Sequence, residues 1–294
     1  MLVAARPSHD NSIASTGTGE HSPARLSCPH MLERRSSANG VVCYVSPLLE
    51  SIGVPHAFST RIGGVSPPPF DRLNLGNPNG CPVQDDYQRI WENYRLLQAA
   101  IGCESRRLAR VHQVHGCQLA HLAQDHDDSL RADALITSDA RWLVSVRVAD
   151  CVPVLLASAD GKVVAAVHAG WRGVVAGIVP KAIAAVQKLA GPGTAVTIAI
   201  GPCISGDAYE VGPEVLEQFT RCLGNEAPIS RRVGGKGYVD LRQAIRLQAL
   251  GAGLPPKHID TTDRCTYRHA AEFFSHRREN GITGRMAAII ATRA

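Results

Sequence analysis

Residues 142–173 read WLVSVRVADCVPVLLASADGKVVAAVHAGWRG, and this stretch decides the fold. Three short apolar runs, 142–148, 153–158 and 163–168, are separated by polar and glycine-containing segments. Runs of this length that are rich in Val and Leu are typical of buried β-strands. The stretch therefore predicts strands in the middle of a large sheet system.

Outside this stretch, the chain alternates between strand-like and helix-like patterns. Further strand-like runs are LARVHQV (108–114), CQLAHL (117–122), ADALIT (132–137), AVTIAIG (195–201) and a final RMAAIIAT (285–292). Apolar residues at helical spacing predict helices over 84–101, 174–190, 213–223 and 241–250, the last with Asp240 as its N-cap. Because strands and helices are interspersed without regular βαβ alternation, we expect one mixed α+β domain.

The domain is expected to cover residues 41–294. Residues 1–40 are rich in Ser, Pro, Gly, Thr and His, and their few apolar residues show no period. This composition predicts a flexible N-terminal extension.

Charge, hydropathy and cysteine usage exclude several classes of protein. The 31 basic and 26 acidic residues leave a formal charge of +5, which is too mild to indicate nucleic-acid binding. No apolar run approaches the about 20 residues that span a bilayer, and the N-terminus lacks the apolar segment of a secretory signal, so we expect a cytoplasmic protein without a membrane partner. The nine cysteines are dispersed, which indicates reduced thiols rather than a disulfide scaffold.

Three segments place reactive side chains where a strand runs into a turn. They are HQVHG (112–116), ADCVP (149–153) and HAGWRG (168–173). Their residues His115, Cys151 and His168 offer the imidazole and thiolate groups that zinc prefers, and three protein ligands leave a fourth position for water or substrate. The pattern is compatible with a catalytic metal site, although the spacing alone is weak support for one.

Two alternatives stay open at this point. If HQVHG is a strand, His112 and His115 point to opposite faces, and the spacing does not decide which one reaches the site. Cys151 could also be a nucleophile with His168 as its base, the arrangement of cysteine hydrolases. The additional histidine favours the metal site, because a Cys–His pair does not require it.

Two arginines are candidates for holding an anion. Arg61 follows a strand-like run and precedes Gly63–Gly64, so its guanidinium and nearby backbone N–H groups could hold a phosphate or a carboxylate. Arg172 offers a bidentate fork within HAGWRG, where a structural turn is the alternative role. No P-loop, GxSxG or Rossmann fingerprint is present, so no motif indicates nucleoside triphosphate binding or serine hydrolysis.

The segments, in this order, resemble the laccase-domain or multicopper polyphenol oxidase family, whose members are described as purine nucleoside phosphorylases with adenosine deaminase activity. The resemblance covers residues 54–292. It is carried by HAFSTRIGGVS (56–66), HQVHG, ADALIT, ADCVPVLL, AAVHAGWRG, IGPCISGDAYEVGPEV (200–215), DRCTY and FFSHRRENGITGRMAAII (273–290). It implies a four-layer α-β-β-α sandwich, similar to that of certain cysteine-hydrolase toxins.

The resemblance also implies a ligand set. The metal ligands are expected to be His115, Cys151 and His168, with zinc as the usual ion and copper also reported for the family. It selects the histidine before Gly116 over His112.

The implied function is that of a zinc-dependent purine nucleoside phosphorylase, acting on adenosine, inosine or methylthioadenosine, with adenosine deaminase activity. The expected partners are therefore a nucleoside and phosphate, and we expect a monomer. In this hypothesis Arg61 and Asn74 orient phosphate or ribose, Asp150 is an acid–base or ligand-supporting residue, and Arg172 is a weaker anion candidate.

Two other activities follow from the same resemblance. One is a peptidoglycan-editing amidase that removes a wrong amino acid from UDP-MurNAc precursors. The other is copper polyphenol oxidase activity. Laccase chemistry is the lesser alternative, because the 12 histidines include no HxH pair of the kind that holds a trinuclear copper cluster.

Overall fold

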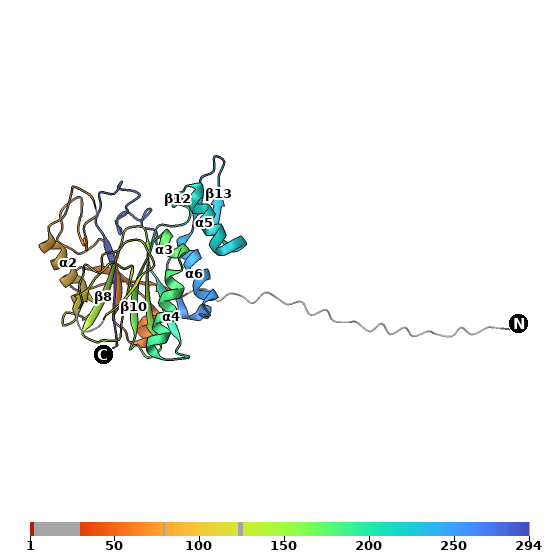
Figure 1. The fold of residues 1–294 in the computed structure, drawn as a ribbon, viewed down its shortest axis with the longest axis horizontal. Helices are drawn as coiled ribbons and strands as arrows, with labels where there is room; N and C mark the ends of the chain where they lie inside the picture. The colour runs from red at the N-terminus through yellow and green to blue at the C-terminus, as the bar shows by residue number, and fades with distance from the viewer. Residues whose placement is uncertain (3–29, 79, 123–125, 294) are drawn as a thin grey trace.

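Two large β-sheets lie face to face at the centre of the molecule, and helices cover their outer faces (Figure 1). The computed structural model describes residues 1–2, 30–78, 80–122 and 126–293. A third, small sheet lies against one helix of an outer layer. This arrangement decides which segments of the chain meet at the candidate site.

The first large sheet has seven strands. In spatial order they are β1 (His30–Met31), β15 (Ile259–Thr261), β11 (Val196–Ile200), β9 (Val152–Ser158), β10 (Val164–Ala169), β7 (Ala134–Thr137) and β6 (Leu119–His121). The antiparallel pair of β9 and β10 lies in the middle, with Pro153 opposite His168 and Val152 opposite Ala169. Every residue of these two strands is buried, as expected for strands that are covered on both faces.

The second large sheet has six strands. In spatial order they are β2 (Glu33–Ser36), β3 (Val42–Val45), β4 (His56–Ser59), β16 (Met286–Ala291), β8 (Trp142–Val148) and β5 (Arg107–Ala109). The pairings are antiparallel, except that β5 runs parallel to β8. The last strand of the chain, β16, lies in the interior of the sheet, so the two ends of the domain are packed together.

Alternation along the strands separates three layers of apolar packing. In β8, Leu143 faces the outer layer while Val144 faces the other sheet. In β9, Leu155 faces the second sheet while Leu156 faces the opposite outer layer. This period of two is the consequence of strand geometry, and because both faces of each strand are covered, most residues of both strands are apolar.

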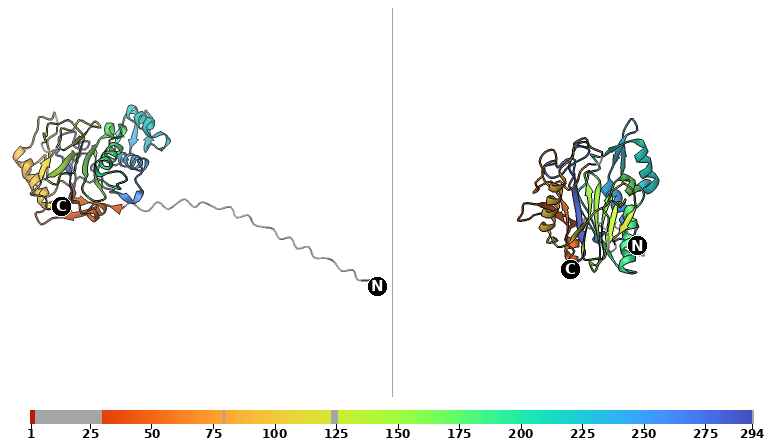
Figure 2. Two further views of the ribbon diagram at one scale, coloured as in Figure 1. Left: turned by 60° about the horizontal axis from the view of Figure 1, so that its bottom comes forward. Right: turned by 60° about the vertical axis from the view of Figure 1, so that its left-hand side comes forward.

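The helices form the two outer layers. The seven-stranded sheet is covered by α3 (Trp171–Val175), α4 (Ile178–Ala190) and α6 (Leu241–Gly251), with α5 (Pro213–Leu223) packed beside them. The six-stranded sheet is covered by α2 (Tyr87–Ala100). The remaining elements are α1 (Pro47–Ile52), the 3₁₀ turns Gly224–Glu226 and Pro256–His258, and the small sheet of β12 (Glu210–Val211), β14 (Gly237–Val239) and β13 (Ile229–Arg231). The right-hand view of Figure 2 shows helices on both sides of the stacked sheets, which confirms the expected mixed α+β, four-layer sandwich.

The predicted helices compare closely with the observed ones, with one exception. The helix at 213–223 is observed with these bounds, and Asp240 caps α6 by accepting a hydrogen bond from the Gln243 N–H. The helix predicted over 174–190 ends where predicted but begins too early, because α4 starts at Ile178 and a separate short helix, α3, ends at Val175. Gly177 separates them with a φ of 73°, in the left-handed region that favours glycine.

The folded domain begins before residue 41, contrary to our expectation. β1 pairs with β15, and β2 pairs with β3. The side chains of β2 are all exposed, so this edge strand is held by backbone hydrogen bonds that leave no apolar pattern in the sequence. Residues 3–29, on which the expected extension also falls, lie outside the described residues.

The cysteines of the described residues are free thiols, as their dispersed positions predicted. This applies to eight of them, while Cys28 lies outside the described residues. Within the same part of the chain, the helices are all too short or too polar to cross a lipid bilayer.

Candidate metal centre

Three chain segments bring His115, Cys151 and His168 together. Their ligand atoms all lie within 4.8 Å of one another, and the two imidazole rings meet edge to face with centroids 4.8 Å apart. The pairing of β9 with β10 explains part of this geometry, because Cys151 immediately precedes β9 and His168 lies near the end of β10. The third residue, His115, comes from the loop between β5 and β6.

The HQVHG segment is not the strand that we predicted. His112 forms an isolated bridge with Arg131, and the following residues form a loop in which His115 adopts a φ of 58°. A positive φ is unusual for a residue with a side chain, and here it accompanies the placement of the imidazole beside Cys151. His112 lines a neighbouring cavity instead of joining the three residues.

Asp133 contacts two of the three segments that carry the candidate ligands. Its carboxylate is fully buried and lies 2.8 Å from Nδ1 of His168. It also accepts hydrogen bonds from the backbone N–H groups of His115, at 2.9 Å, and Gly116, at 2.6 Å. One side chain therefore orients two of the three candidate ligands, leaving Nε2 of His168 for a metal, an arrangement that is usual around metal-bound histidines.

The charges of this cluster stabilise one another. Burial raises the pKa of the Cys151 thiol, but the His168 charge and hydrogen bonds from both imidazoles outweigh it, and the pKa falls to about 6. Burial likewise lowers the pKa of His168, but Cys151 and Asp133 raise it to about 9. Burial raises the pKa of Asp133 and its contacts with His168 lower it, with a net decrease. The site thus favours a thiolate beside positive charge.

The donor set fits a zinc or copper ion. Two imidazoles and a thiolate suit both metals. In a tetrahedral zinc site such ligand atoms lie about 3.4–3.6 Å apart, so the observed upper limit of 4.8 Å requires little more than about 1 Å of closure. Gly170 provides room for this cluster, because a Cβ there would lie 3.2 Å from Sγ of Cys151 and 3.2 Å from Cδ2 of His115.

The three residues open onto a cavity of about 400 Å³. Its polar lining includes the predicted residues Asp150 and Arg172. Asp150 has a φ of 88°, and its two carboxylate oxygens accept from the Thr266 hydroxyl, at 2.6 Å, and from the Arg277 N–H, at 2.7 Å. Arg172 is exposed and lies 4.5 Å from the ring centre of Trp171.

Arg61 and Asn74 do not line this cavity. The Arg61 guanidinium donates to the carbonyl and carboxylate of Asp71 and lies over the ring of Phe274. Asn74 is fully buried, where it donates to Asp85 and accepts from the backbone N–H of Arg285. Both side chains therefore hold loops together, and our hypothesis that they orient phosphate or ribose is not supported by their positions.

Sequence reasoning missed several residues of the site. Asp133, Arg147, His276, Arg277 and Arg285 all surround the candidate ligands or line the cavity. Arg147 carried a signal, since it is a charged residue inside the apolar run 142–148. The charged group SHRREN at 275–280 carries part of the family resemblance, but nothing in its spacing indicates that His276 and Arg277 line the same cavity as Cys151.

Comparisons with known proteins agree with this fold. The family model described as multi-copper polyphenol oxidoreductase laccase matches residues 55–293. A protein named purine nucleoside phosphorylase from Deinococcus radiodurans is 37% identical over 246 residues, which is 83% of this chain and 92% of the relative. Purine nucleoside phosphorylase YfiH of Escherichia coli is 37% identical over 238 residues, 81% of this chain and 93% of the relative.

A solved structure shows the same architecture. YlmD from Geobacillus stearothermophilus has a TM-score of 0.79 and 32% sequence identity, and the match covers 90% of this chain and all of that one. Extensive sequence similarity and the shared fold lead to one conclusion. The chain belongs to the multi-copper polyphenol oxidoreductase laccase family.

Proposed function

We propose that this protein is a zinc-dependent purine nucleoside phosphorylase with adenosine deaminase activity. The observation that carries the proposal is the convergence of His115, Cys151 and His168 at the wall of a cationic cavity of about 400 Å³. Relatives at 37% identity bear the name purine nucleoside phosphorylase. Cavities of this size commonly enclose small ligands such as nucleosides.

In this proposal the three residues hold zinc, which would polarise a substrate oxygen or lower the pKa of a water molecule. Asp133 keeps the His168 ring oriented through its Nδ1 contact. Asp150 has one hydrogen bond to each carboxylate oxygen, and its remaining lone pairs are available to ribose hydroxyls. The arginines of the lining stabilise the negative charge of a phosphate nucleophile.

The test combines metal analysis with product separation. Protein of known zinc content is incubated with adenosine, with and without phosphate, and the products are separated by chromatography. Adenine that forms only with phosphate establishes phosphorolysis, and inosine in either tube establishes deamination. Intact adenosine in both tubes, with about one zinc bound per chain, would overturn the proposal.

A pair of cysteine variants tests the site itself. Cys151→Ala removes one candidate ligand, so we expect loss of both zinc and turnover. Cys222→Ala is the matched control, because Cys222 is an exposed free thiol that does not line the cavity. Retained zinc and full activity in Cys151→Ala would contradict the assignment.

One observation favours a second candidate. Cys151, His168 and Asp133 form a thiol–imidazole–carboxylate series, with His168 contacting both other groups. This series is also the arrangement of a cysteine hydrolase, and an amidase acting on cell-wall precursors is the corresponding activity. Release of L-serine or L-alanine from such a precursor would support this alternative, and loss of that release on zinc chelation would assign it to the metal rather than to the thiol.

Polyphenol oxidation has less support. Within the described residues, His115, Cys151 and His168 form the single cluster with metal-ligand geometry. A four-electron copper oxidase needs several linked copper sites, and one three-ligand site does not supply them.

A further inference from the structure

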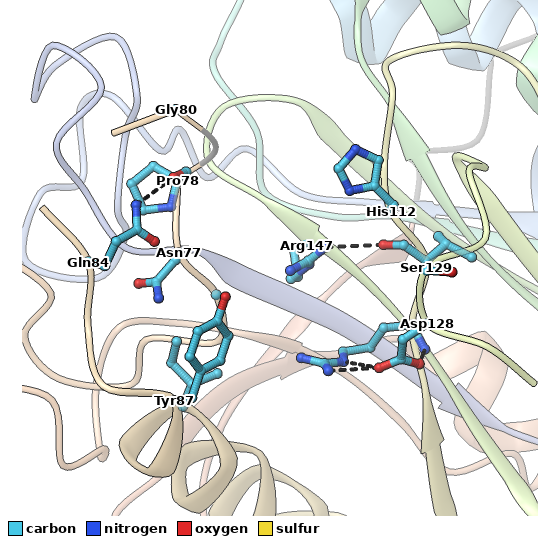
Figure 3. A pocket seen from close by; sticks show the side chains of 13 residues that line it. Asn77, Pro78, Gly80, Gln84, Tyr87, His112, Asp128, Ser129 and Arg147 are labelled. Carbon is cyan, nitrogen blue, oxygen red and sulfur yellow. Dashed lines mark hydrogen bonds and ion pairs between the residues drawn. The ribbon is translucent and has the colours of Figure 1, made fainter. Parts of the chain in front are cut away.

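Two arginines at neighbouring strands of the six-stranded sheet line the cavity. Arg147 lies in β8, and Arg285 lies just before β16, the strand that pairs with β8. Both line the cavity that holds the candidate metal ligands. Arg147 also lines a second cavity of about 370 Å³, so it stands in the wall between the two. Figure 3 shows Arg147 in this second cavity, between Asn77 on one side and His112 on the other.

The position of Arg147 is firmly held. Gln113 accepts from the backbone N–H of Arg147 and donates to its carbonyl, each at 2.8 Å. The aliphatic part of the side chain passes over Gly76, where a Cβ would come within 2.8 Å of Cδ of Arg147. The backbone and the stem are therefore fixed, and the guanidinium is presented at a defined place, as a binding group requires.

Arg285 is held in a similar way. Its backbone N–H donates to Asn74, at 2.9 Å, and its Nη1 donates to the carbonyls of Thr283 and Gly284. Asn74 therefore contacts the cavity only indirectly, through the backbone of Arg285. Asn74 positions Arg285.

Among the described residues, no carboxylate lies within ion-pair distance of either guanidinium, although Asp150 lines the same cavity. Arg147 donates from Nη2 to the Val111 carbonyl, and the Arg285 guanidinium donates to backbone carbonyls as well. By contrast, Arg110 in the second cavity is paired with Asp128 at 2.7 Å. Burial, followed by the charge of Arg147, lowers the pKa of Arg285, and the charges of Cys151 and Asp150 offset this decrease only in part.

We infer that Arg147 and Arg285 form the subsite for a phosphate dianion. Each guanidinium retains N–H donors beyond those used by the carbonyls, and such donors match phosphate oxygens in bidentate geometry. A bound dianion would compensate the two positive charges and lie in the same cavity as the candidate metal. The second cavity gives this subsite an additional opening to solvent beside Arg147.

The inference deepens the proposed function, and its turnover test rests on that function. If phosphate is the nucleophile, Arg147→Met should raise the KM for phosphate by about 10- to 100-fold, the effect of losing a hydrogen bond to a charged group. Adenosine deamination uses no phosphate, so at low phosphate Arg147→Met should reduce phosphorolysis by a much larger factor than it reduces deamination. Arg147→Lys keeps the charge and the stem, and we expect an intermediate KM.

Direct binding separates this inference from the proposed function. Inorganic phosphate and adenosine 5′-monophosphate are titrated separately into the full chain, and binding is followed by ³¹P NMR. Whichever of the two ligands the unchanged protein binds identifies the source of the phosphate group. Binding should weaken in both Arg147→Met and Arg285→Met, while Arg95→Met, which alters an exposed ion pair with Glu92, should bind as before.

The outcomes are distinguishable. Phosphate binding that depends on both arginines, without formation of adenine, would support the subsite and refute the phosphorylase function. Formation of adenine with an unchanged KM for phosphate in both Met variants would refute the subsite and support the function. An unchanged protein that binds neither ligand would also overturn the inference. Because Arg285 contacts buried loops, thermal unfolding is measured for each variant, and Arg147→Lys serves if Arg285→Met does not fold.

Discussion

Replacing Asp133 by Asn tests whether one buried carboxylate organises the candidate metal centre. The carboxylate contacts Nδ1 of His168 through one oxygen, together with the His115 N–H, while the other oxygen accepts the Gly116 N–H. An amide keeps a single acceptor oxygen, and its NH₂ group must face one of these donors. At least one charge-assisted hydrogen bond is lost and one buried donor is left unpaired, for a decrease in unfolding free energy of about 2–4 kcal/mol.

The same change should weaken metal binding. Outer residues that orient a metal-bound histidine typically contribute 10- to 100-fold to affinity, and we expect about this loss for zinc. The assays are urea unfolding of the zinc-free protein and competition for zinc against a fluorescent chelator. Asp139→Asn is the control, since this residue forms a surface ion pair with Arg141 and should leave the urea midpoint and the zinc affinity unchanged. Unchanged zinc affinity in the Asp133→Asn variant would refute the orienting role.

Three further predictions concern other buried positions. Burial lowers the pKa of His56 from 6.5 to about 4, and the Ser46 N–H donates to its Nε2. Because the unfolded chain takes up this proton at a higher pH than the folded protein, stability should be fully present above about pH 6.5 and fall by roughly 2–3 kcal/mol on reaching about pH 4.5. Urea unfolding at both pH values should show a smaller fall in His56→Gln, and an equal fall would contradict the assignment. Gly170→Ala places a Cβ 3.2 Å from Sγ of Cys151, so zinc affinity should decrease severalfold with little change in thermal unfolding, and unchanged affinity would show that the cluster has spare room. Gly173→Ala places a Cβ 2.8 Å from the Gly116 carbonyl, and it should lower the unfolding free energy by about 1–3 kcal/mol, whereas a wild-type urea midpoint would show that this contact relaxes freely.

Most of the helices and strands could be predicted because their patterns are local. Helix 213–223 has an apolar face at helical spacing, with Pro213 at its start and Gly224 after its end. The buried strands β9 and β10 carry short apolar runs, which are typical of strands that are covered on both faces. The helix break at Gly177 and the edge strand at 33–36 were missed, since neither alters the apolar pattern on which the predictions rest.

The candidate site was predictable only in part. His115, Cys151 and His168 carry chemistry that is visible in any sequence, and the family resemblance selected His115 over His112. Their supporting residues were not predictable in this way. An aspartate such as Asp133 or an arginine such as Arg285 has the same appearance in a sequence whether it lies on the surface or faces a ligand.

The sequence by itself determined the types of strands and helices, the reactive side chains and the family, because these depend on residue identity and local periodicity. The tertiary structure alone decided the assembly of the cavity. The pairing of β8 with β16 brings Arg147 and Arg285 to one wall although 138 positions separate them in the chain (285 − 147). The same packing places Arg61 and Asn74 outside the cavity lining, in hydrogen bonds with neighbouring loops. The physical reason is that long-range pairing sets which charges are buried together, and that information is absent from any short stretch of sequence.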